Sequence, residues 1–210
     1  MTEANILHDV AAYYGERLRR FGTTPAGVDW RDATSQETRF DQLLRVVAQP
    51  DASLVDLGCG YGALLGHMRA RGFTGAYRGV DIAPEMITAA TTQYGSGSQA
   101  AFELGAAPAL PADYAVASGI FNVRLGISEA DWRGYVDTTI AVLDRAGTRG
   151  FAFNCLTSYS DADRMRPDLY YADPCAYFDM CKRRFSRQVA LLHDYGLYEF
   201  TLIVRKEPHS

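Results

Sequence analysis

The run Asp56-Leu57-Gly58-Cys59-Gly60-Tyr61-Gly62 constrains the fold more than any other stretch of this chain. Glycines at alternate positions permit positive φ angles and let a ligand approach the backbone closely. The apolar segment 53–56 before the run predicts a short strand, and residues 63–71 after it predict a helix. A strand, a glycine turn and a helix in this order indicate an α/β sheet whose ligand binds beyond the carboxyl ends of the strands.

Strand-like and helix-like segments alternate along most of the chain. This alternation indicates a parallel sheet with helices on both faces. The last two strands are joined by only a few residues and must therefore be antiparallel. The predicted fold class is α/β, with a doubly wound, mostly parallel seven-stranded sheet that ends in a C-terminal antiparallel hairpin. The predicted strands are 53–56, 77–81, 100–104, 114–118, 150–156, 188–193 and 197–205.

We predict a single domain over residues 1–210, with an N-terminal helical cap at 1–50 and an α/β core at 51–210. The cap holds an amphipathic helix at residues 4–21 and a second helix that Thr34 and Glu37 begin as a capping box. Within the core, a polar and aromatic lid insertion is expected at about 157–177. Long loops at this edge of an α/β sheet are often functional.

Two ligand classes use such a glycine run. Gly58, Gly60 and Ala63 satisfy the G-x-G-x-x-G/A pattern of dinucleotide-binding folds. Asp56 argues against a dinucleotide, because its carboxylate would crowd a pyrophosphate with like charge, whereas a cationic ligand would tolerate it. Asp81 ends the second strand, where a carboxylate accepts hydrogen bonds from the hydroxyls of a ribose. Its alternative role is to cap the helix that follows.

Two segments together resemble the first two motifs of class I S-adenosylmethionine-dependent methyltransferases. They are Val55-Asp56-Leu57-Gly58-Cys59-Gly60-Tyr61-Gly62 and Gly79-Val80-Asp81-Ile82-Ala83-Pro84-Glu85-Met86-Ile87. The resemblance extends in element order over residues 53–205, and the final hairpin also matches that fold. Residues 27–30 and 35–40 resemble an uncharacterised bacterial branch of the family, which implies no particular acceptor. The resemblance implies S-adenosylmethionine as the cofactor.

Carried over position by position, the resemblance also implies a set of cofactor contacts. Asp56 would hold the ammonium group of the cofactor, and Asp81 its ribose. Many members have an acidic residue after the third strand that accepts from the adenine amino group. Ala106 occupies that position here, so the adenine contact must come from the backbone or elsewhere. The other implied contacts are Gly58, Cys59, Gly60 and Gly62 beside the methionine part, Ile82 and Met86 beside the adenine, and Ser118 and Gly119 facing the methyl group.

The N-terminal helices supply further cofactor candidates. In related methyltransferases such a first helix often covers the cofactor, and Tyr14 lies on it here. Gln36 and Arg39 lie one turn apart on the next helix, so one of them could reach the methionine carboxylate. The alternatives are an ordinary amphipathic helix and two solvent-facing side chains. We expect Trp30 to anchor the core rather than to serve as a ligand platform.

Residues beyond the carboxyl ends of the later strands are candidates for work on the acceptor. The predicted catalytic residues are Asn122 and Arg124, after the fourth strand, and His193, near the final hairpin. The alternatives are a turn hydrogen bond for His193, a surface ion pair for Arg124 and core packing for the tyrosines of the insertion. The predicted substrate-binding residues are Asn122, Arg124, Asn154, Tyr170 and Tyr171.

The composition argues against several classes of partner. The 210 residues carry a formal net charge of −4, and no strong Lys/Arg cluster indicates a nucleic-acid interface. No apolar stretch approaches the ~20 residues that span a bilayer, and the N-terminus lacks a signal-peptide pattern, so we expect a cytoplasmic protein without a membrane partner. The four cysteines form no C-x-x-C pair, so no metal site is expected. The sequence indicates no oligomeric state.

The leading hypothesis is S-adenosylmethionine-dependent methyl transfer to an O or N atom of a small-molecule acceptor. Arg124 favours an anionic acceptor. One alternative is a non-catalytic S-adenosylmethionine-binding module, motivated by the missing acidic adenine contact and the lack of an obvious base. The other is an NAD(P)-dependent oxidoreductase, which rests on the literal G-x-G-x-x-A match.

Overall fold

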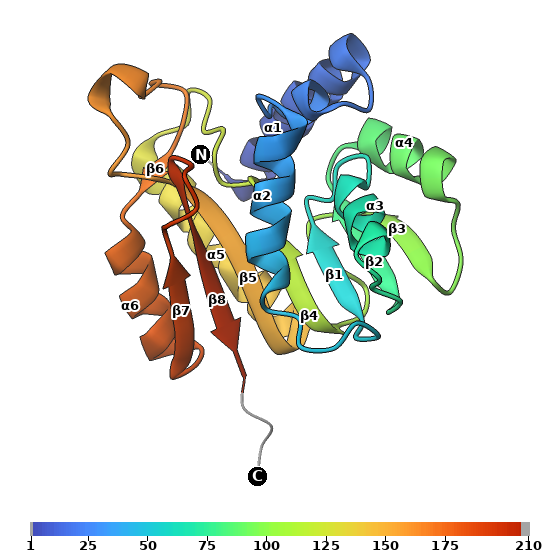
Figure 1. The fold of residues 1–210 in the computed structure, drawn as a ribbon. Helices are drawn as coiled ribbons and strands as arrows, with labels where there is room; N and C mark the ends of the chain where they lie inside the picture. Colours follow the sequence, from blue (N-terminus) through green and yellow to red (C-terminus); the bar gives the residue numbers. More distant parts are fainter. Residues whose placement is uncertain (1, 207–210) are drawn as a thin grey trace.

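A twisted, mostly parallel β-sheet forms the centre of the computed structural model, which describes residues 2–206 (Figure 1). The strand order is β3-β2-β1-β4-β5-β8-β7, in which β8 runs antiparallel to both β5 and β7. This arrangement confirms the predicted sheet and its terminal hairpin. The main strands are β1 (Leu54–Leu57), β2 (Tyr77–Asp81), β3 (Ala100–Leu104), β4 (Ala112–Ala117), β5 (Gly147–Thr157), β7 (Gln188–Leu192) and β8 (Glu199–Arg205).

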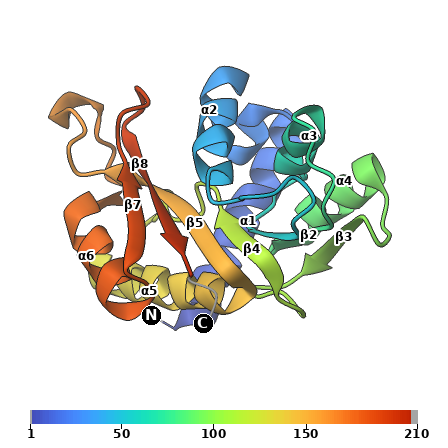
Figure 2. The same cartoon turned by 60° about the horizontal axis from the view of Figure 1, so that its bottom comes forward.

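Helices cover both faces of the sheet (Figure 2). On one face, α2 and α3 bury their apolar side chains against β1, β4, β5 and β8. On the other face, α1, α5 and α6 do the same, and α1 also contacts α4. The helices are α1 (Glu3–Phe21), α2 (Ala33–Leu44), α3 (Ala63–Ala70), α4 (Pro84–Tyr94), α5 (Glu129–Ala146) and α6 (Pro174–Arg184), with the short 3₁₀ turns η1 (Pro25–Val28) and η2 (Ala162–Arg164).

The pattern of α5 shows why these segments form amphipathic helices. Trp132, Val136, Ile140 and Leu143 recur at intervals of three or four residues and are all fully buried. The indole of Trp132 also donates a hydrogen bond of 3.0 Å to the carbonyl oxygen of Phe121, so its one polar atom is satisfied. This helix therefore fixes the backbone that follows β4.

The start of α2 differs from the sequence-based prediction. Asp32, not Thr34, is the N-cap, and its carboxylate accepts a hydrogen bond of 2.7 Å from the backbone N–H of Ser35. Thr34 lies inside the first turn, so the predicted capping box is wrong. Gln36 and Arg39 lie on the buried side of this helix.

The segment between β5 and α6 contains an eighth, two-residue strand that the sequence analysis missed. This strand, β6 (Tyr171–Ala172), pairs in parallel with the end of β5. The backbone N–H groups of Arg124 and Leu125 donate to the carbonyl oxygen of Asp168, which ties the segment to the chain beyond β4. Within residues 2–206, no helix is both long enough and apolar enough to cross a membrane.

Candidate functional site

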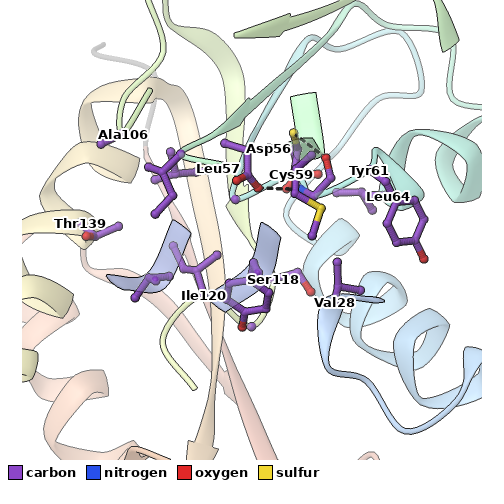
Figure 3. Close-up of a pocket in the computed structure, with 18 of the residues that line it drawn as sticks. Val28, Asp56, Leu57, Cys59, Tyr61, Leu64, Ala106, Ser118, Ile120 and Thr139 are labelled. Carbon is purple, nitrogen blue, oxygen red and sulfur yellow. Dashed lines mark hydrogen bonds between the residues drawn. The ribbon is translucent and has the colours of Figure 1, made fainter. Parts of the chain in front are cut away.

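A cavity lies at the carboxyl ends of β1, β2 and β4, where the glycine run turns into α3 (Figure 3). Residues of α1, η1 and α2 form its outer wall. All predicted cofactor contacts except Gly62 and Arg39 line it. They are Tyr14, Gln36, Asp56, Gly58, Cys59, Gly60, Asp81, Ile82, Met86, Ala106, Ser118 and Gly119.

The glycine run has the backbone conformation that only glycine adopts readily. Gly58, Gly60 and Gly62 have φ angles of +75°, +54° and +84°. Gly62 is the N-cap of α3 rather than a lining residue, and a Cβ atom there would lie 2.9 Å from the ring of Tyr94. Gly62 therefore does not line the cavity in this structure, and its contact with the cofactor stays a prediction.

Asp81 connects the end of β2 to the glycine run. One carboxylate oxygen accepts from the backbone N–H of Gly60 at 2.8 Å, and the other accepts from that of Ala83 at 2.9 Å. Burial raises the pKa of Asp81, while these N–H groups oppose the shift. Each oxygen keeps a further lone pair for a ligand hydroxyl. The alternative role as a helix cap is not what the structure shows, because Ala83 is the N-cap of α4 and no side chain of the described residues caps that helix. The carboxylate of Asp81 remains part of the cavity wall.

Asp56 and Ser118 place unsatisfied oxygen atoms in the cavity wall. One carboxylate oxygen of Asp56 accepts a 2.6 Å hydrogen bond from the hydroxyl of Tyr77. The other oxygen of Asp56 and the hydroxyl of Ser118 are buried without a partner among the described residues. Burial raises the pKa of Asp56 to about 7, although the bond from Tyr77 lowers it. A buried acceptor without a donor costs ~1–3 kcal/mol, so a ligand that brings a hydrogen-bond donor, above all a cationic one, fits here.

Trp30 separates this cavity from a second one. A Cβ atom on Gly119 would lie 2.2 Å from the indole ring, so only glycine allows Trp30 to lie this close to the end of β4. The guanidinium group of Arg39 lies over the indole ring of Trp30, 3.9 Å from its centre. Trp30 is partly exposed and lines both cavities, so the prediction of a core anchor was wrong.

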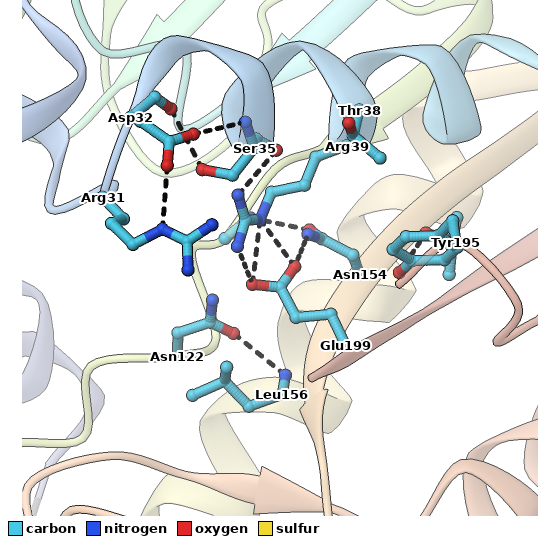
Figure 4. Close-up of polar contacts among 12 residues, drawn as sticks. Arg31, Asp32, Ser35, Thr38, Arg39, Asn122, Asn154, Leu156, Tyr195 and Glu199 are labelled. Atoms are coloured by element: carbon cyan, nitrogen blue, oxygen red, sulfur yellow. Dashed lines mark hydrogen bonds and ion pairs between the residues drawn. The ribbon is translucent and has the colours of Figure 1, made fainter. Parts of the chain in front are cut away.

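The second cavity, called the acceptor-side pocket below, adjoins the first. The two share Tyr14, Val28, Trp30 and Gly119. Figure 4 shows Arg31, Asn122 and the Arg39–Glu199 pair facing a common space. The other lining residues of this pocket are Asp29, Val123, Leu156, Arg166 and Leu169.

Comparison with known proteins decides the family. The chain is 57% identical over 164 residues to a protein of Mycobacterium tuberculosis (strain ATCC 25618 / H37Rv) named "Putative methyltransferase Rv1506c", and the match covers 78% of this chain and 99% of that protein. The chain belongs to the S-adenosylmethionine-dependent methyltransferases. Residues 54–147 also match the family model described as a methyltransferase domain.

Solved structures with little sequence identity share the fold of this methyltransferase. The DhpI–SAH complex superposes with a TM-score of 0.66 at 12% identity, over 99% of this chain and 100% of that one. Magnesium protoporphyrin IX methyltransferase (ChlM) from Synechocystis PCC 6803, with SAM bound, gives a TM-score of 0.65 at 16% identity, over 95% and 97% of the two chains.

The family membership fixes the cofactor of this methyltransferase as S-adenosylmethionine, rather than the dinucleotide that the G-x-G-x-x-A match alone would allow. It also decides against a purely non-catalytic binding role. The cavity agrees with this cofactor, because the unpartnered oxygen of Asp56 suits the ammonium group of an amino acid. A pyrophosphate at the same place would meet the carboxylates of both Asp56 and Asp81.

In this methyltransferase, Arg39 is not free to bind a carboxylate of the cofactor. Its guanidinium group forms three short contacts with the carboxylate of Glu199, at 2.7–2.9 Å, and donates to the carbonyl oxygen of Ser35. Both side chains are buried, and Arg39 lines only the acceptor-side pocket. The prediction of a methionine-carboxylate contact for Arg39 is therefore wrong, and of the two residues only Gln36 lines the cofactor cavity.

Of the two asparagines predicted to bind the acceptor, only Asn122 lines the acceptor-side pocket. Its amide oxygen accepts from the backbone N–H of Leu156, which leaves the amide nitrogen facing the pocket (Figure 4). Asn154 is fully buried. It accepts from the N–H of Gly119 at 2.7 Å and donates to Glu199 at 2.6 Å, so it positions the end of β4 and cannot touch an acceptor.

Arg124 and Tyr171 hold the insertion in place rather than lining a pocket. The guanidinium group of Arg124 donates to the carbonyl oxygens of Ile127 and Pro167. The hydroxyl of Tyr171 accepts from the backbone N–H of Arg166 at 2.9 Å. The predicted direct contacts of both residues with the acceptor are corrected accordingly. Both side chains fix the short stretch that carries Arg166 to the pocket.

Tyr170 and His193 also lie outside both cavities. Tyr170 is buried in the core, where its hydroxyl lies 3.1 Å from that of Tyr177. His193 is exposed beyond β7, with its ring centre 5.9 Å from that of Tyr159. The core packing that was the alternative for Tyr170 is what the structure shows, and the catalytic role predicted for His193 has no support in its position.

The sequence analysis missed several residues that shape the site. Tyr77 was taken only as part of a strand, although a tyrosine within an apolar buried strand is a sign that its hydroxyl has a partner. Arg31 and Arg166 line the acceptor-side pocket from loops, and no local pattern marks them. Val28 lies in residues 27–30, which the resemblance had already singled out, but no role was predicted for it.

Proposed function

We propose that this methyltransferase transfers the methyl group of S-adenosylmethionine to an oxygen or nitrogen atom of a small molecule bound in the acceptor-side pocket. The observation that carries the proposal is the shared wall of the two cavities, where Tyr14, Trp30 and Gly119 border both. An atom that reaches this junction from the acceptor side meets the place where a cofactor in the first cavity would present its methyl group.

The proposed cofactor contacts follow from the cavity wall. Asp56 receives the ammonium group on its unpartnered oxygen, and Asp81 accepts from the ribose hydroxyls. S-adenosylmethionine itself supplies a methyl group already activated on a cationic sulfur. The protein has to orient the two molecules and exclude water, and orientation alone can lower a barrier by ~7–11 kcal/mol. The adenine would lie near Ile82, Met86 and Ala106, with Ser118 and Gly119 toward the methyl position and Gly58, Cys59 and Gly60 along the methionine part.

Calorimetric titration with S-adenosylhomocysteine tests the cofactor half of the proposal. We expect saturable binding, and no heat at millimolar ligand would overturn the proposal. Production of S-adenosylhomocysteine from any acceptor in a metabolite screen tests the other half. Turnover would also show that binding alone is not the function.

The ribose contact can be tested on its own with Asp81→Ala. We expect the dissociation constant for S-adenosylhomocysteine to rise by the equivalent of roughly 1.5–3 kcal/mol, the range for hydrogen bonds to a charged group. Asp81→Asn is the matched control for shape, because it keeps an acceptor for one of the two backbone N–H groups. An unchanged dissociation constant in both variants, with intact thermal unfolding, would contradict the assignment.

A further inference from the structure

The acceptor-side pocket presents hydrogen-bond donors that nothing in the described chain uses. Arg31 engages Asp32 only through its Nε atom, so its two terminal nitrogens have no partner within residues 2–206. The guanidinium of Arg166 pairs with Asp168 through Nε and one terminal nitrogen, which leaves the other terminal nitrogen for a ligand. The amide nitrogen of Asn122 faces the same space (Figure 4).

These two arginines are easily recruited by a ligand. The side chain of Arg31 is 83% exposed and that of Arg166 is 54% exposed. Exposed ion pairs of this kind are worth only ~0–1 kcal/mol, so exchanging Asp32 or Asp168 for a ligand oxyanion costs little. A guanidinium group matches a carboxylate or phosphate with two parallel hydrogen bonds. The position of Arg166 is set by the contacts of Arg124 and Tyr171 with its segment.

Among residues 2–206, no basic group that lines this pocket is free to remove a proton from the acceptor. The carboxylate of Asp29 accepts from Tyr13 at 2.9 Å and pairs with Arg17 at 2.9 Å. Both oxygens of Glu199 are taken by Arg39 and Asn154. Burial raises the pKa of Tyr14, so its hydroxyl stays protonated. No histidine lines the pocket among the described residues.

Free donors and the lack of a base both point to an acceptor that arrives already ionised. We infer, resting on the methyl transfer proposed above, that the acceptor is a small molecule with a carboxylate or phosphate group held by Arg31, Arg166 and Asn122, and that an oxygen of this group receives the methyl. The new bond joins that oxygen to the methyl carbon. The carbon–sulfur bond breaks, and its electron pair stays on sulfur, giving S-adenosylhomocysteine and a methyl ester.

This reaction needs no general base, because an ionised oxygen has no proton to lose. The acceptor gives up one negative charge when the ester forms. The two arginines therefore hold the product less firmly than the acceptor, which favours release.

A binding experiment tests the recognition. Benzoate, phenyl phosphate and the neutral benzamide are titrated into protein saturated with S-adenosylhomocysteine. We expect at least one anion to bind about tenfold more tightly than benzamide, and its affinity to fall with added salt. Tighter binding of benzoate would indicate a carboxylate site, and tighter binding of phenyl phosphate a phosphate site. Equal affinity for benzamide, or no binding of either anion, would overturn the inference.

Matched arginine variants show where the anion binds. Arg31→Gln/Arg166→Gln should abolish the preference for the anion and leave S-adenosylhomocysteine affinity unchanged. Arg164→Gln is the control, because Arg164 is a 70% exposed arginine of the same segment that lines neither cavity. A preference that survives in the double variant, or is lost equally in the control, contradicts the assignment.

Proton release tests the attacking atom. A panel of carboxylates and phosphomonoesters, each beside its neutral amide or ester, is incubated with S-adenosylmethionine in weak buffer with a pH indicator. We expect turnover on oxyanion members without proton release, and the product should be a methyl ester. Release of one proton per turnover would overturn the inference. Turnover of only the neutral or amino compounds, with none of the carboxylates or phosphomonoesters, would overturn it as well. If S-adenosylhomocysteine itself fails to bind, the proposed function fails first, and the calorimetry separates the two cases.

Discussion

Asp56 is a buried carboxyl group in the wall of the first cavity. Its carboxyl group is buried, one oxygen accepts from Tyr77, and the other has no partner in the described chain. Burial raises its pKa to about 7, with the nearby charge of Asp81 adding to the shift. A group with a pKa near neutrality in a ligand cavity makes ligand binding depend on pH in the physiological range.

We predict that the affinity for S-adenosylhomocysteine rises with pH up to about 7 and then levels off. The ammonium group of the ligand prefers the ionised carboxylate, so binding below the pKa of Asp56 must release a proton, at a cost of up to about tenfold in affinity per pH unit. Calorimetry between pH 5.5 and 8 measures this. Asp56→Asn should bind more weakly with a much flatter profile, and an unchanged slope in that variant would contradict the assignment.

The raised pKa of Asp56 has the opposite pH dependence for stability: as the pH rises, the ligand-free protein becomes less stable. The pKa of Asp56 is higher in the folded chain than in the unfolded one, so the folded state keeps the proton between about pH 4 and 7. Its contribution to stability is therefore fully present at about pH 4 and is lost as the pH rises to about 7. Ligand binding is thus expected to stabilise the protein most where this contribution has been lost.

At the residue scale, the cofactor side was predictable and the acceptor side was not. The glycine run and Asp56 lie at the end of β1, and Asp81 ends β2, so a local pattern at each strand end carries their position. Asn154 bonds to Gly119 and Glu199, which are distant in sequence, and no local pattern reveals that its amide is fully used. Arg124 was misassigned for the same reason.

Among the elements, α2 and β8 are joined by the longest-range ion pair of the site. Arg39 and Glu199 are 160 positions apart in the sequence, and their side chains are buried together. Asn154 extends the contact from Glu199 to the backbone of Gly119. The pair therefore couples the outer helix of the cap to the strand end that borders both cavities.

We predict that Arg39→Met destabilises the protein by about 3–5 kcal/mol, because it leaves Glu199 as a buried charge without its cation. Urea unfolding measures the loss. Arg39→Met/Glu199→Gln should recover part of it, since the second change removes the uncompensated charge. Arg45→Met is the control on an exposed position just beyond the same helix, and an equal loss there would contradict the role of the pair.

The elements themselves followed from periodicity, with two exceptions. The main strands and helices have clear apolar patterns, and the structure confirms their order. β6 has only two residues, too few for any alternation to show. The start of α2 was misplaced because Asp32 and Thr34 are both good caps, and the choice depends on which backbone N–H groups the folded turn exposes.

On the scale of the whole molecule, elements from the N-terminal and the C-terminal parts of the chain both contribute to the site. Residues of α1 line both cavities, those of α2 do so as well, and Glu199 at the start of β8 lines the acceptor-side pocket. Figure 1 shows α1, α2 and β8 in blue and red, from the two ends of the sequence. Ligand binding should therefore raise the free energy of unfolding of the whole domain, and not only order a single loop.

We predict a clear rise in melting temperature with S-adenosylhomocysteine. At a concentration one hundred times the dissociation constant, binding adds about 2.7 kcal/mol, which corresponds to roughly 5–10 °C for a chain of this size. Thermal scanning at several ligand concentrations measures the rise. Asp81→Ala should show a smaller shift at the same ligand concentration, and a shift independent of concentration would argue against specific binding.

The residues between the two cavities limit which substitutions can change the acceptor without changing cofactor binding. Trp30 and Gly119 fit each other so closely that a change in either alters the cofactor side and the acceptor side together. Arg31, Arg166 and Leu169 border the acceptor-side pocket alone. Variation at these three positions can explore new acceptors while the cofactor machinery stays intact, so they are the natural targets for a library that seeks altered specificity.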